Sequence, residues 1–149
     1  MPRPHPLRLI AIVAGTFVAS YFAIAIGLFI FGGDDCENEV LAEFAAPNAS
    51  ATAVVFQRSC GATTGFSTQV SIIPTGTALP NEGGNAFVSD TNHGASPSGP
   101  GGGPELALSW RSSNELVIAH HPATRVLSHE PVVNGVKVHA EPGLPRRDG

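Results

Sequence analysis

The chain begins with one long apolar run and then changes to short segments in which apolar and polar residues alternate. Residues 9–31 form 23 consecutive positions without a charge. A helix of that length spans about 35 Å, which is enough to cross a hydrocarbon core of about 30 Å. The run is longer than the apolar region of a signal peptide, and it ends in FGGDDC without the small-residue pattern of a cleavage site. We therefore predict an uncleaved transmembrane helix at 9–31, preceded by a short N-terminus at 1–8.

The second half of the pattern predicts a β-domain. Beyond residue 33 no apolar segment keeps a helical period, whereas period-2 alternation and β-branched runs recur between turn signals. Tight turns are expected at PNAS (47–50), RSSNE (111–115) and NG (134–135). The fold class is therefore all-β: a transmembrane helix followed by a small antiparallel β-sheet domain of six to eight strands at 34–140. The expected strands are Val40–Phe44, Ala53–Arg58, Thr68–Ile73, Asn85–Ser89, Leu106–Trp110, Leu116–His120, Val126–Ser128 and Val136–Ala140.

Two segments are expected to lie outside the packed interior. Residues 91–104, TNHGASPSGPGGGP, have no apolar side chain larger than Ala and predict a flexible insert that contributes nothing to the core. Residues 141–149, EPGLPRRDG, predict a disordered tail. The remaining alternation assigns the core to Phe44, Phe56, Phe87, Leu106, Leu108, Trp110, Leu116 and Ile118.

The distribution of charge predicts orientation and excludes one class of partner. Arg3 and Arg8 precede the apolar run, and no basic residue follows it until Arg58. The positive-inside rule therefore places the N-terminus in the cytoplasm and the β-domain on the exocytoplasmic side. All 12 acidic residues and six of the eight basic ones follow residue 33, so this part carries a formal charge of −6. That sign argues against nucleic acid as a partner.

The two cysteines, Cys36 and Cys60, predict one disulfide. Both fall on the exocytoplasmic side, where disulfides persist, and an even count there favours pairing. A hairpin centred near Asn48 places them directly opposite each other, with Cα atoms about 4.5–5.5 Å apart. The alternative is a thiol nucleophile at Cys60, for which backbone N–H groups of Gly61, Ala62 and Thr63 would stabilise an oxyanion.

Histidines supply the other candidate chemistry. A small thiol- or metal-dependent enzyme would draw on Cys60 with His120, His121 or His129. However, no CxxC, HExxH or HxH spacing is present, and adjacent residues of a strand point to opposite faces. We therefore assign no catalytic, cofactor-binding or metal-binding residue and expect no cofactor.

One stretch resembles a known group of sequences. FQRSCGATTGFSTQVSI, together with the later LSWRSSNELVIAH, resembles a family of small uncharacterised bacterial membrane-anchored proteins with a CGATT string. APNASATAVVF is also loosely similar to phrases of β-propeller blades, although the chain has material for at most two blades. The resemblance implies a bacterial protein with an N-terminal hydrophobic segment, and it supplies no site. Together with the orientation predicted above, it indicates a single-pass protein of the inner membrane with a periplasmic domain.

The expected function is therefore a non-catalytic, membrane-anchored binding or accessory domain. Its expected partners are the membrane itself and another membrane-bound or exocytoplasmic protein. Two alternatives stay open: the small enzyme described above, and an accessory subunit of a larger membrane complex.

Overall fold

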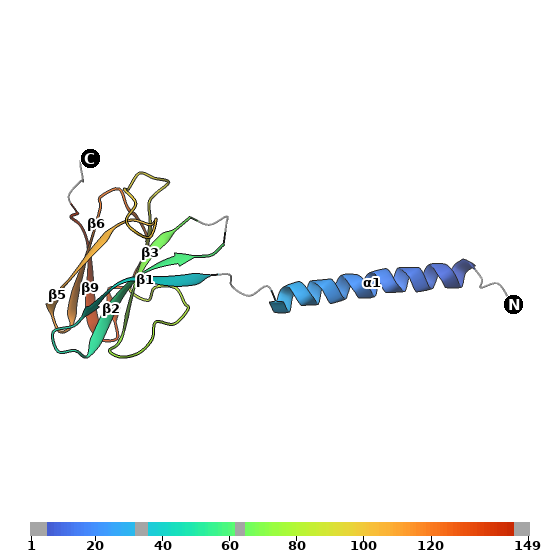
Figure 1. The fold of residues 1–149 in the computed structure, drawn as a ribbon, viewed down its shortest axis with the longest axis horizontal. Coiled ribbons are helices and arrows are strands. Elements are labelled where there is room, and N and C mark those ends of the chain that lie inside the picture. Colours follow the sequence, from blue (N-terminus) through green and yellow to red (C-terminus); the bar gives the residue numbers. More distant parts are fainter. Residues whose placement is uncertain (1–5, 32–35, 62–64, 145–149) are drawn as a thin grey trace. The chain divides into compact units, whose positions relative to one another are not determined.

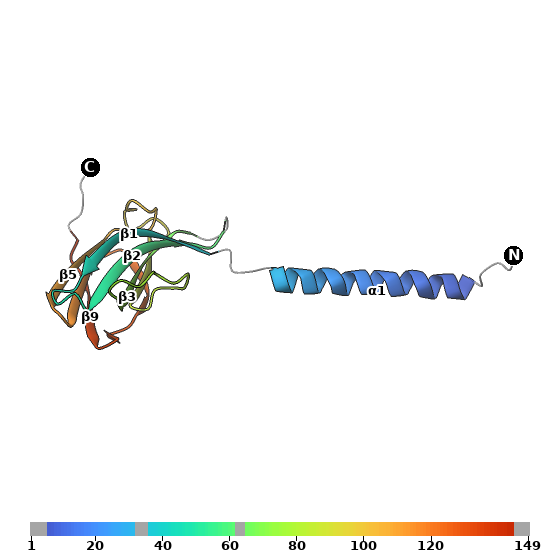
Figure 2. The ribbon, with the colours of Figure 1, turned by 60° about the horizontal axis from the view of Figure 1, so that its bottom comes forward.

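The structure is a computed structural model that describes residues 6–31, 36–61 and 65–144 (Figure 1). The chain divides into two units, Met1–Asp35 and Cys36–Gly149. The first contains α1 (Pro6–Phe31), one continuous helix (Figure 2) that confirms the predicted apolar helix and begins three residues earlier. Proline suits the first helical turn, because its missing N–H would have no partner there. Within α1, Ile10–Gly27 is long and apolar enough to cross a membrane. Residues 1–5 of the predicted cytoplasmic segment lie outside the described residues.

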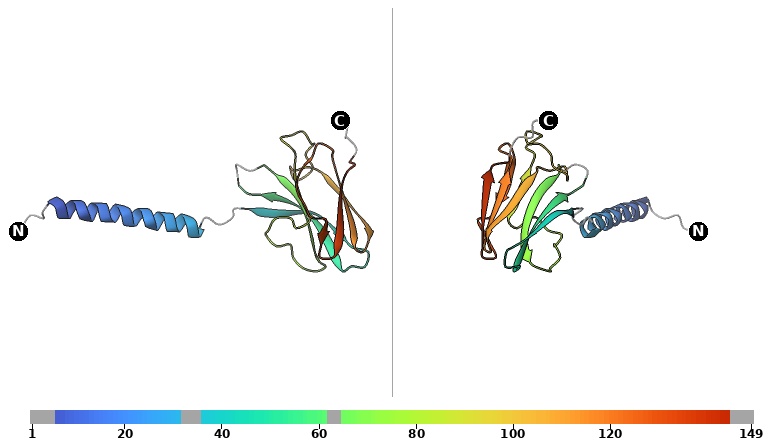
Figure 3. Two further views of the ribbon diagram at one scale, coloured as in Figure 1. Left: turned by 180° about the vertical axis from the view of Figure 1, so that it is seen from behind. Right: turned by 60° about the vertical axis from the view of Figure 1, so that its left-hand side comes forward.

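The second unit is a sandwich of two β-sheets, seen as two layers in Figure 3. The five-stranded sheet has the order β1-β2-β3-β4-β7, and the four-stranded sheet has the order β5-β6-β9-β8. The strands are β1 (Glu37–Ala45), β2 (Ala51–Ser59), β3 (Ser67–Pro74), β4 (Phe87–Asp90), β5 (Leu106–Ser112), β6 (Glu115–His120), β7 (Arg125–His129), β8 (Val132–Val133) and β9 (Val136–Pro142).

The all-β fold class is confirmed, with two corrections. All eight expected strands are present, and their ends differ from the prediction by at most three residues. A ninth strand, β8, was missed because two residues are too few to show a pattern. Among the described strands, every pairing is antiparallel except β6 with β9, which run parallel. The chain leaves β6, pairs β7 with the other sheet, and returns through β8, so β9 arrives beside β6 in the same direction.

The main core lies between the two sheets. Phe87, Leu116 and Ile118 are fully buried there, and each contributes about 1.5–3 kcal/mol by leaving water. Phe44, Leu106 and Trp110 are half-buried at its margin, and the Trp110 Nε1–H donates to the Phe44 carbonyl at 3.0 Å. This bond joins β5 of one sheet to β1 of the other. Leu108, also expected in the core, is buried with them.

A second, smaller cluster explains why Phe56 is buried. Phe56 faces away from the other sheet and packs with Val54 and Ile73, with Leu79 against them. Leu79 belongs to the connection between β3 and β4, which therefore covers part of the outer face of the five-stranded sheet. The rest of that face, nearer the disulfide, is not covered by this cluster.

The disulfide between Cys36 and Cys60 is confirmed, with their Cα atoms 3.9 Å apart. The adjacent pair is Glu37 opposite Ser59, which is the register expected for a hairpin centred near Asn48. Beyond Val40 the register shifts by one residue, because Leu41 forms a β-bulge. The predicted register therefore holds at the disulfide end and slips by one position at the turn end.

The turn between β1 and β2 forms where it was predicted. The Ser50 N–H and hydroxyl both donate to Asn48 Oδ1, at 3.1 and 2.8 Å. This is the local side-chain bonding that makes Asn a turn former. The NG turn is also confirmed: Asn134 and Gly135 both have positive φ, at 50° and 82°, between β8 and β9.

The segment 91–104 was expected to contribute nothing to the interior, and that prediction is wrong. Ser96 and Pro104 are fully buried, and the Ser96 hydroxyl is 2.9 Å from that of Thr124. Gly103 allows the backbone of this segment to approach β3 closely. A Cβ added to Gly103 would lie 2.5 Å from the Thr68 Oγ1 and 2.7 Å from the Thr68 backbone nitrogen. We call residues 91–104 the insert.

The C-terminal tail begins later than predicted. β9 extends to Pro142, so Glu141 and Pro142 belong to the sheet. The backbone N–H groups of Gly143 and Leu144 then donate to the His120 carbonyl, at 3.0 and 3.2 Å. Residues 145–149 of the expected disordered tail lie outside the described residues.

Candidate binding site at the loop end of the sandwich

Cys60, the candidate nucleophile, is bonded to Cys36 through sulfurs 2.07 Å apart. In the part of the chain that the structure describes, no cysteine is free. The thiol hypothesis therefore has no nucleophile while this bond is intact. Ala62 and Thr63, two of the candidate oxyanion donors, lie outside the described residues.

His120 and His121 serve the local structure in different ways. The His120 ring is buried and stacked on Phe87, with ring centroids 5.8 Å apart. Its Nδ1 lies 3.0 Å from the His121 carbonyl, which can only accept, so this nitrogen is the donor. His121 Nδ1 instead accepts a bond from the Ala123 N–H at 3.1 Å and helps to form the turn after β6. Neither pattern resembles a metal site.

The remaining histidines are dispersed over the sandwich. His129 Nε2 bonds to the Val138 carbonyl at 3.0 Å, and His139 Nε2 lies 3.1 Å from Glu115 Oε1 without the geometry of a hydrogen bond. Within residues 6–31, 36–61 and 65–144, no three side chains of His, Cys, Asp or Glu are grouped so that they could hold a metal ion. The structure thus does not bring together the histidines that the metal hypothesis requires.

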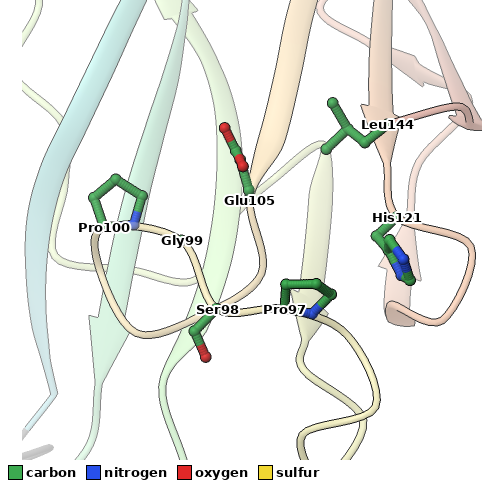
Figure 4. A pocket seen from close by; sticks show the side chains of 7 residues that line it. All are labelled: Pro97, Ser98, Gly99, Pro100, Glu105, His121 and Leu144. Carbon is green, nitrogen blue, oxygen red and sulfur yellow. The ribbon is translucent and has the colours of Figure 1, made fainter. Parts of the chain in front are cut away.

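The insert borders hollows at one end of the sandwich. A small hollow of about 280 Å³ lies between the insert on one side and His121 and Leu144 on the other (Figure 4). Its walls are mostly proline, glycine and leucine, with Glu105 as the acidic member. Because His121 Nδ1 is already bonded to the backbone, this hollow offers few groups for recognition.

A larger hollow, about 700 Å³, lies over the outer face of the five-stranded sheet beside the disulfide. We call it the outer groove. Alternation along β3 and β4 accounts for its floor: Val70 and Phe87 point into the core, so Gln69 and Val88 point outward. Its lining is Arg58, Cys60, Gly65, Phe66, Ser67, Gln69, Gly83, Val88, Asp90, Thr91, His93, Gly102, Arg125 and Leu127.

Two large apolar side chains are exposed in the outer groove. Phe66 is 49% and Leu127 is 54% exposed, and both line the same hollow. Leu127 is the extra residue of a β-bulge, because the pairing of β7 with β4 shifts by one residue at this position. Single exposed apolar residues are common, but two that share a concave site favour binding of an apolar group.

An ion pair forms one wall of the groove. Arg125 Nε donates to both carboxylate oxygens of Asp90, at 2.9 and 3.1 Å, and its Nη2 donates to Asp90 Oδ2. These bonds hold the pKa of Asp90 below its ordinary value of 3.8; the Asn92 N–H and the charges of Arg125 and His93 act in the same direction, and burial opposes them. The pair raises the pKa of Arg125 in turn. Both groups are therefore charged at neutral pH and largely compensate each other.

Arg58, on the opposite wall, is held differently. Its Nη1 donates to Asn38 Oδ1 at 2.7 Å and to Asn81 Oδ1 at 3.2 Å, and both acceptors are neutral amides. The amides are themselves anchored: Asn38 Nδ2 donates to the carbonyls of Pro80 and Glu82, and Asn81 Nδ2 donates to the Cys36 carbonyl. The guanidinium is thus fixed by two strands, the β3–β4 connection and the residue that forms the disulfide.

Sequence reasoning did not find this groove. Its lining comes from β2, β3, β4, β7, the insert and the connections on either side of β3, and no two of its charged residues share a sequence motif. The alternation of β3 and β4, which places polar residues on an outer face, was the one signal that pointed to it. The composition of the insert predicts a segment outside the core, so the sequence gives no sign that the insert forms part of the wall of the outer groove.

Comparison with known proteins adds no relative to this description. No protein-family model matches the chain, and neither a curated protein nor a solved structure is similar to it. The resemblance based on the CGATT string, which crosses residues 62–64 outside the described part, therefore stays a prediction.

Proposed function

We propose that this protein is a membrane-anchored binding protein, with α1 as the anchor and the β-sandwich as a non-catalytic domain on the exocytoplasmic side. The flanking charges support this orientation, since Arg3 precedes α1, Arg8 lies in its first turn, and acidic residues follow the helix. The disulfide supports an oxidising compartment. For a bacterial protein, as the CGATT resemblance implies, that compartment is the periplasm and the membrane is the inner one.

The observation that carries the binding role is the outer groove. It combines a fixed guanidinium at Arg58 with exposed apolar side chains at Phe66 and Leu127. Concave sites with an apolar lining and a few well-held polar groups are typical of ligand sites. Loops on a rigid sandwich commonly carry such sites, which gives the packed insert a role.

Photo-crosslinking tests the binding role in the membrane. A photoreactive benzoylphenylalanine replaces Leu127 in the full-length protein, and the matched control replaces Ala107, which is exposed on β5 of the other sheet. After irradiation of intact cells, mass spectrometry should detect an adduct at position 127 and none at position 107. Equal labelling at both positions, or none at 127 under any growth condition, would refute the groove as the binding site.

The orientation has a separate test. A reporter enzyme that works only in the cytoplasm, fused after Gly149, should be inactive, because the proposed topology places that end outside. Strong activity of this fusion would reverse the orientation and remove the argument for an oxidising compartment.

The edge of the five-stranded sheet favours a second candidate, an accessory subunit of a larger membrane complex. β7 is the last strand of this sheet and is exposed along its whole length, with Val126 39% exposed. An unprotected edge strand can pair with a strand of another protein. Migration far above 15.3 kDa in a native gel of mild-detergent extracts, lost when Val126 is replaced by Lys, would support this candidate over a small ligand.

A further inference from the structure

We propose that the ligand of the outer groove is a small amphiphilic carboxylate, bound through the free edge of Arg58 with its apolar body against Phe66 and Leu127. This inference rests on the proposed binding role and names the ligand class. It follows from three observations: which donors of Arg58 are used, how the charges of the groove balance, and where its exposed apolar side chains lie.

The donors of Arg58 are used on one side only. Nη1 has two hydrogens, and both are engaged, by Asn38 and Asn81. Among the residues described, nothing bonds to Nε or Nη2, and no carboxylate forms an ion pair with this guanidinium. The Nε–Nη2 edge presents two parallel N–H groups, the geometry that matches the two oxygens of a carboxylate. A guanidinium held on one edge with the other unused is organised for such a partner.

The charge of the groove matches a monoanion. Arg125 and Asp90 compensate each other, which leaves Arg58 as the arginine of the lining that has no carboxylate partner among the described residues. The part of the chain after residue 33 has a formal charge of −6, so this positive charge is opposite in sign to its surroundings. A phosphate dianion would normally require more than one free cation, whereas a single carboxylate needs one bidentate guanidinium.

The apolar side chains define the rest of the ligand. Phe66 and Leu127 are about half exposed and line the same hollow as Arg58, with Val88 in its floor. A volume of about 700 Å³ is within the usual range for small-molecule sites. The free carboxyl end of a peptide and a free acyl or aryl acid share this chemistry: an apolar body that ends in one carboxylate.

The test is a binding measurement on the full-length protein in lipid nanodiscs. The probe is 3-(4-fluorophenyl)propanoate, observed by broadening of its ¹⁹F NMR signal, and empty nanodiscs correct for partition into lipid. The neutral amide of the same acid and 4-fluorophenyl phosphate are compared with it at pH 7. The carboxylate should bind, and the amide should bind at least about tenfold more weakly, because it cannot form the charge-assisted pair with Arg58.

Variants locate the binding. Arg58→Gln should weaken carboxylate binding about tenfold or more, and Leu127→Ala should weaken it several-fold while leaving the fold intact, because that side chain is exposed. The matched control is Arg111→Gln, which removes a guanidinium paired with Glu115 and Glu141 outside the groove and should leave binding unchanged. If Arg58→Gln does not fold, the comparison of acid with amide on the wild type and the Leu127 variant decide the question.

The results that would overturn the proposal are specific. Equal binding of acid and amide, tighter binding of the phosphate, no binding of the acid, or unchanged binding in a folded Arg58→Gln variant each refute a carboxylate at Arg58. Displacement of the probe by N-acetylphenylalanine points to a peptide carboxyl end, and displacement by octanoate points to a free acid; displacement by neither refutes the class. If position 127 crosslinks but the acid binds no more tightly than the amide, only the carboxylate inference is refuted. If position 127 does not crosslink and the acid does not bind selectively, the binding role is refuted as well.

Discussion

Replacement of Cys36 or Cys60 by Ser should destabilise the β-sandwich by an amount that follows from the loop the disulfide closes. The disulfide joins residues 24 positions apart and thus closes a loop of about 25 residues, for which chain entropy predicts about 3.5 kcal/mol of stabilisation. The neighbouring pair of Glu37 with Ser59 lies in register with the bond, so the folded hairpin should form without it. For a domain of about 110 residues, each kcal/mol corresponds to about 4 °C in Tm, which gives a loss of about 15 °C.

The assay is thermal unfolding of the full-length protein in a mild detergent, followed by the fluorescence of Trp110, the only tryptophan. The Tm should fall by the same amount in both single variants and in the double variant, because each removes the same covalent constraint. A reductant should lower the Tm of the wild type by this amount and leave the double variant unchanged. Single variants that differ by more than about 4 °C, or a double variant that loses much more than either, would show that one cysteine has a role apart from the bond.

Three further predictions address the insert, the contact between the sheets and the groove. Gly103→Ala should cost about 1–3 kcal/mol in denaturant unfolding, because its added Cβ has no room against β3, whereas Gly65→Ala, which meets nothing within 4 Å, should be neutral. Trp110→Phe should cost about 1 kcal/mol by circular dichroism through loss of the bond to the Phe44 carbonyl, and a neutral result would show that water replaces it. Because the pKa of Asp90 is lowered in the folded state, the contribution of its carboxylate to stability is present above pH 3.8 and is lost as pH falls through the folded pKa. The denaturant midpoint of the wild type should therefore fall more steeply with acid than that of Asp90→Asn. Parallel curves would refute a stabilising role of the ion pair.

Local rules accounted for most of the secondary structure. Period-2 alternation located eight strands to within three residues, and the NG and PNAS turns formed where Asn makes or tolerates the required backbone. The apolar run at 9–31 predicted α1 for the same reason: it depends only on neighbouring residues. These signals act over a few positions, so they can be read without knowing the rest of the fold.

The hairpin shows the limit of such rules. Its register at Cys36 and Cys60 followed from turn position alone, but the bulge at Leu41 did not. Leu41 packs against the core and lies near Gly101 of the insert, where an added Cβ would be 3.1 Å from its Cδ1. The bulged residue thus lies beside a segment about 60 residues away in the chain, and no local pattern contains such a contact.

By itself the sequence determined the apolar helix, the strands, the turns and the pairing of the two cysteines, because each rests on local periodicity or on a count. The tertiary structure decided the rest. Alternation is the same for parallel and antiparallel neighbours, so the β6–β9 pairing was not predictable from it. The composition of the insert predicted a flexible segment, whereas Gly103 is needed where the backbone of the insert meets Thr68. The fixed guanidinium of Arg58 exists only because distant strands and the β3–β4 connection meet around it, and contacts of that kind arise when the chain packs.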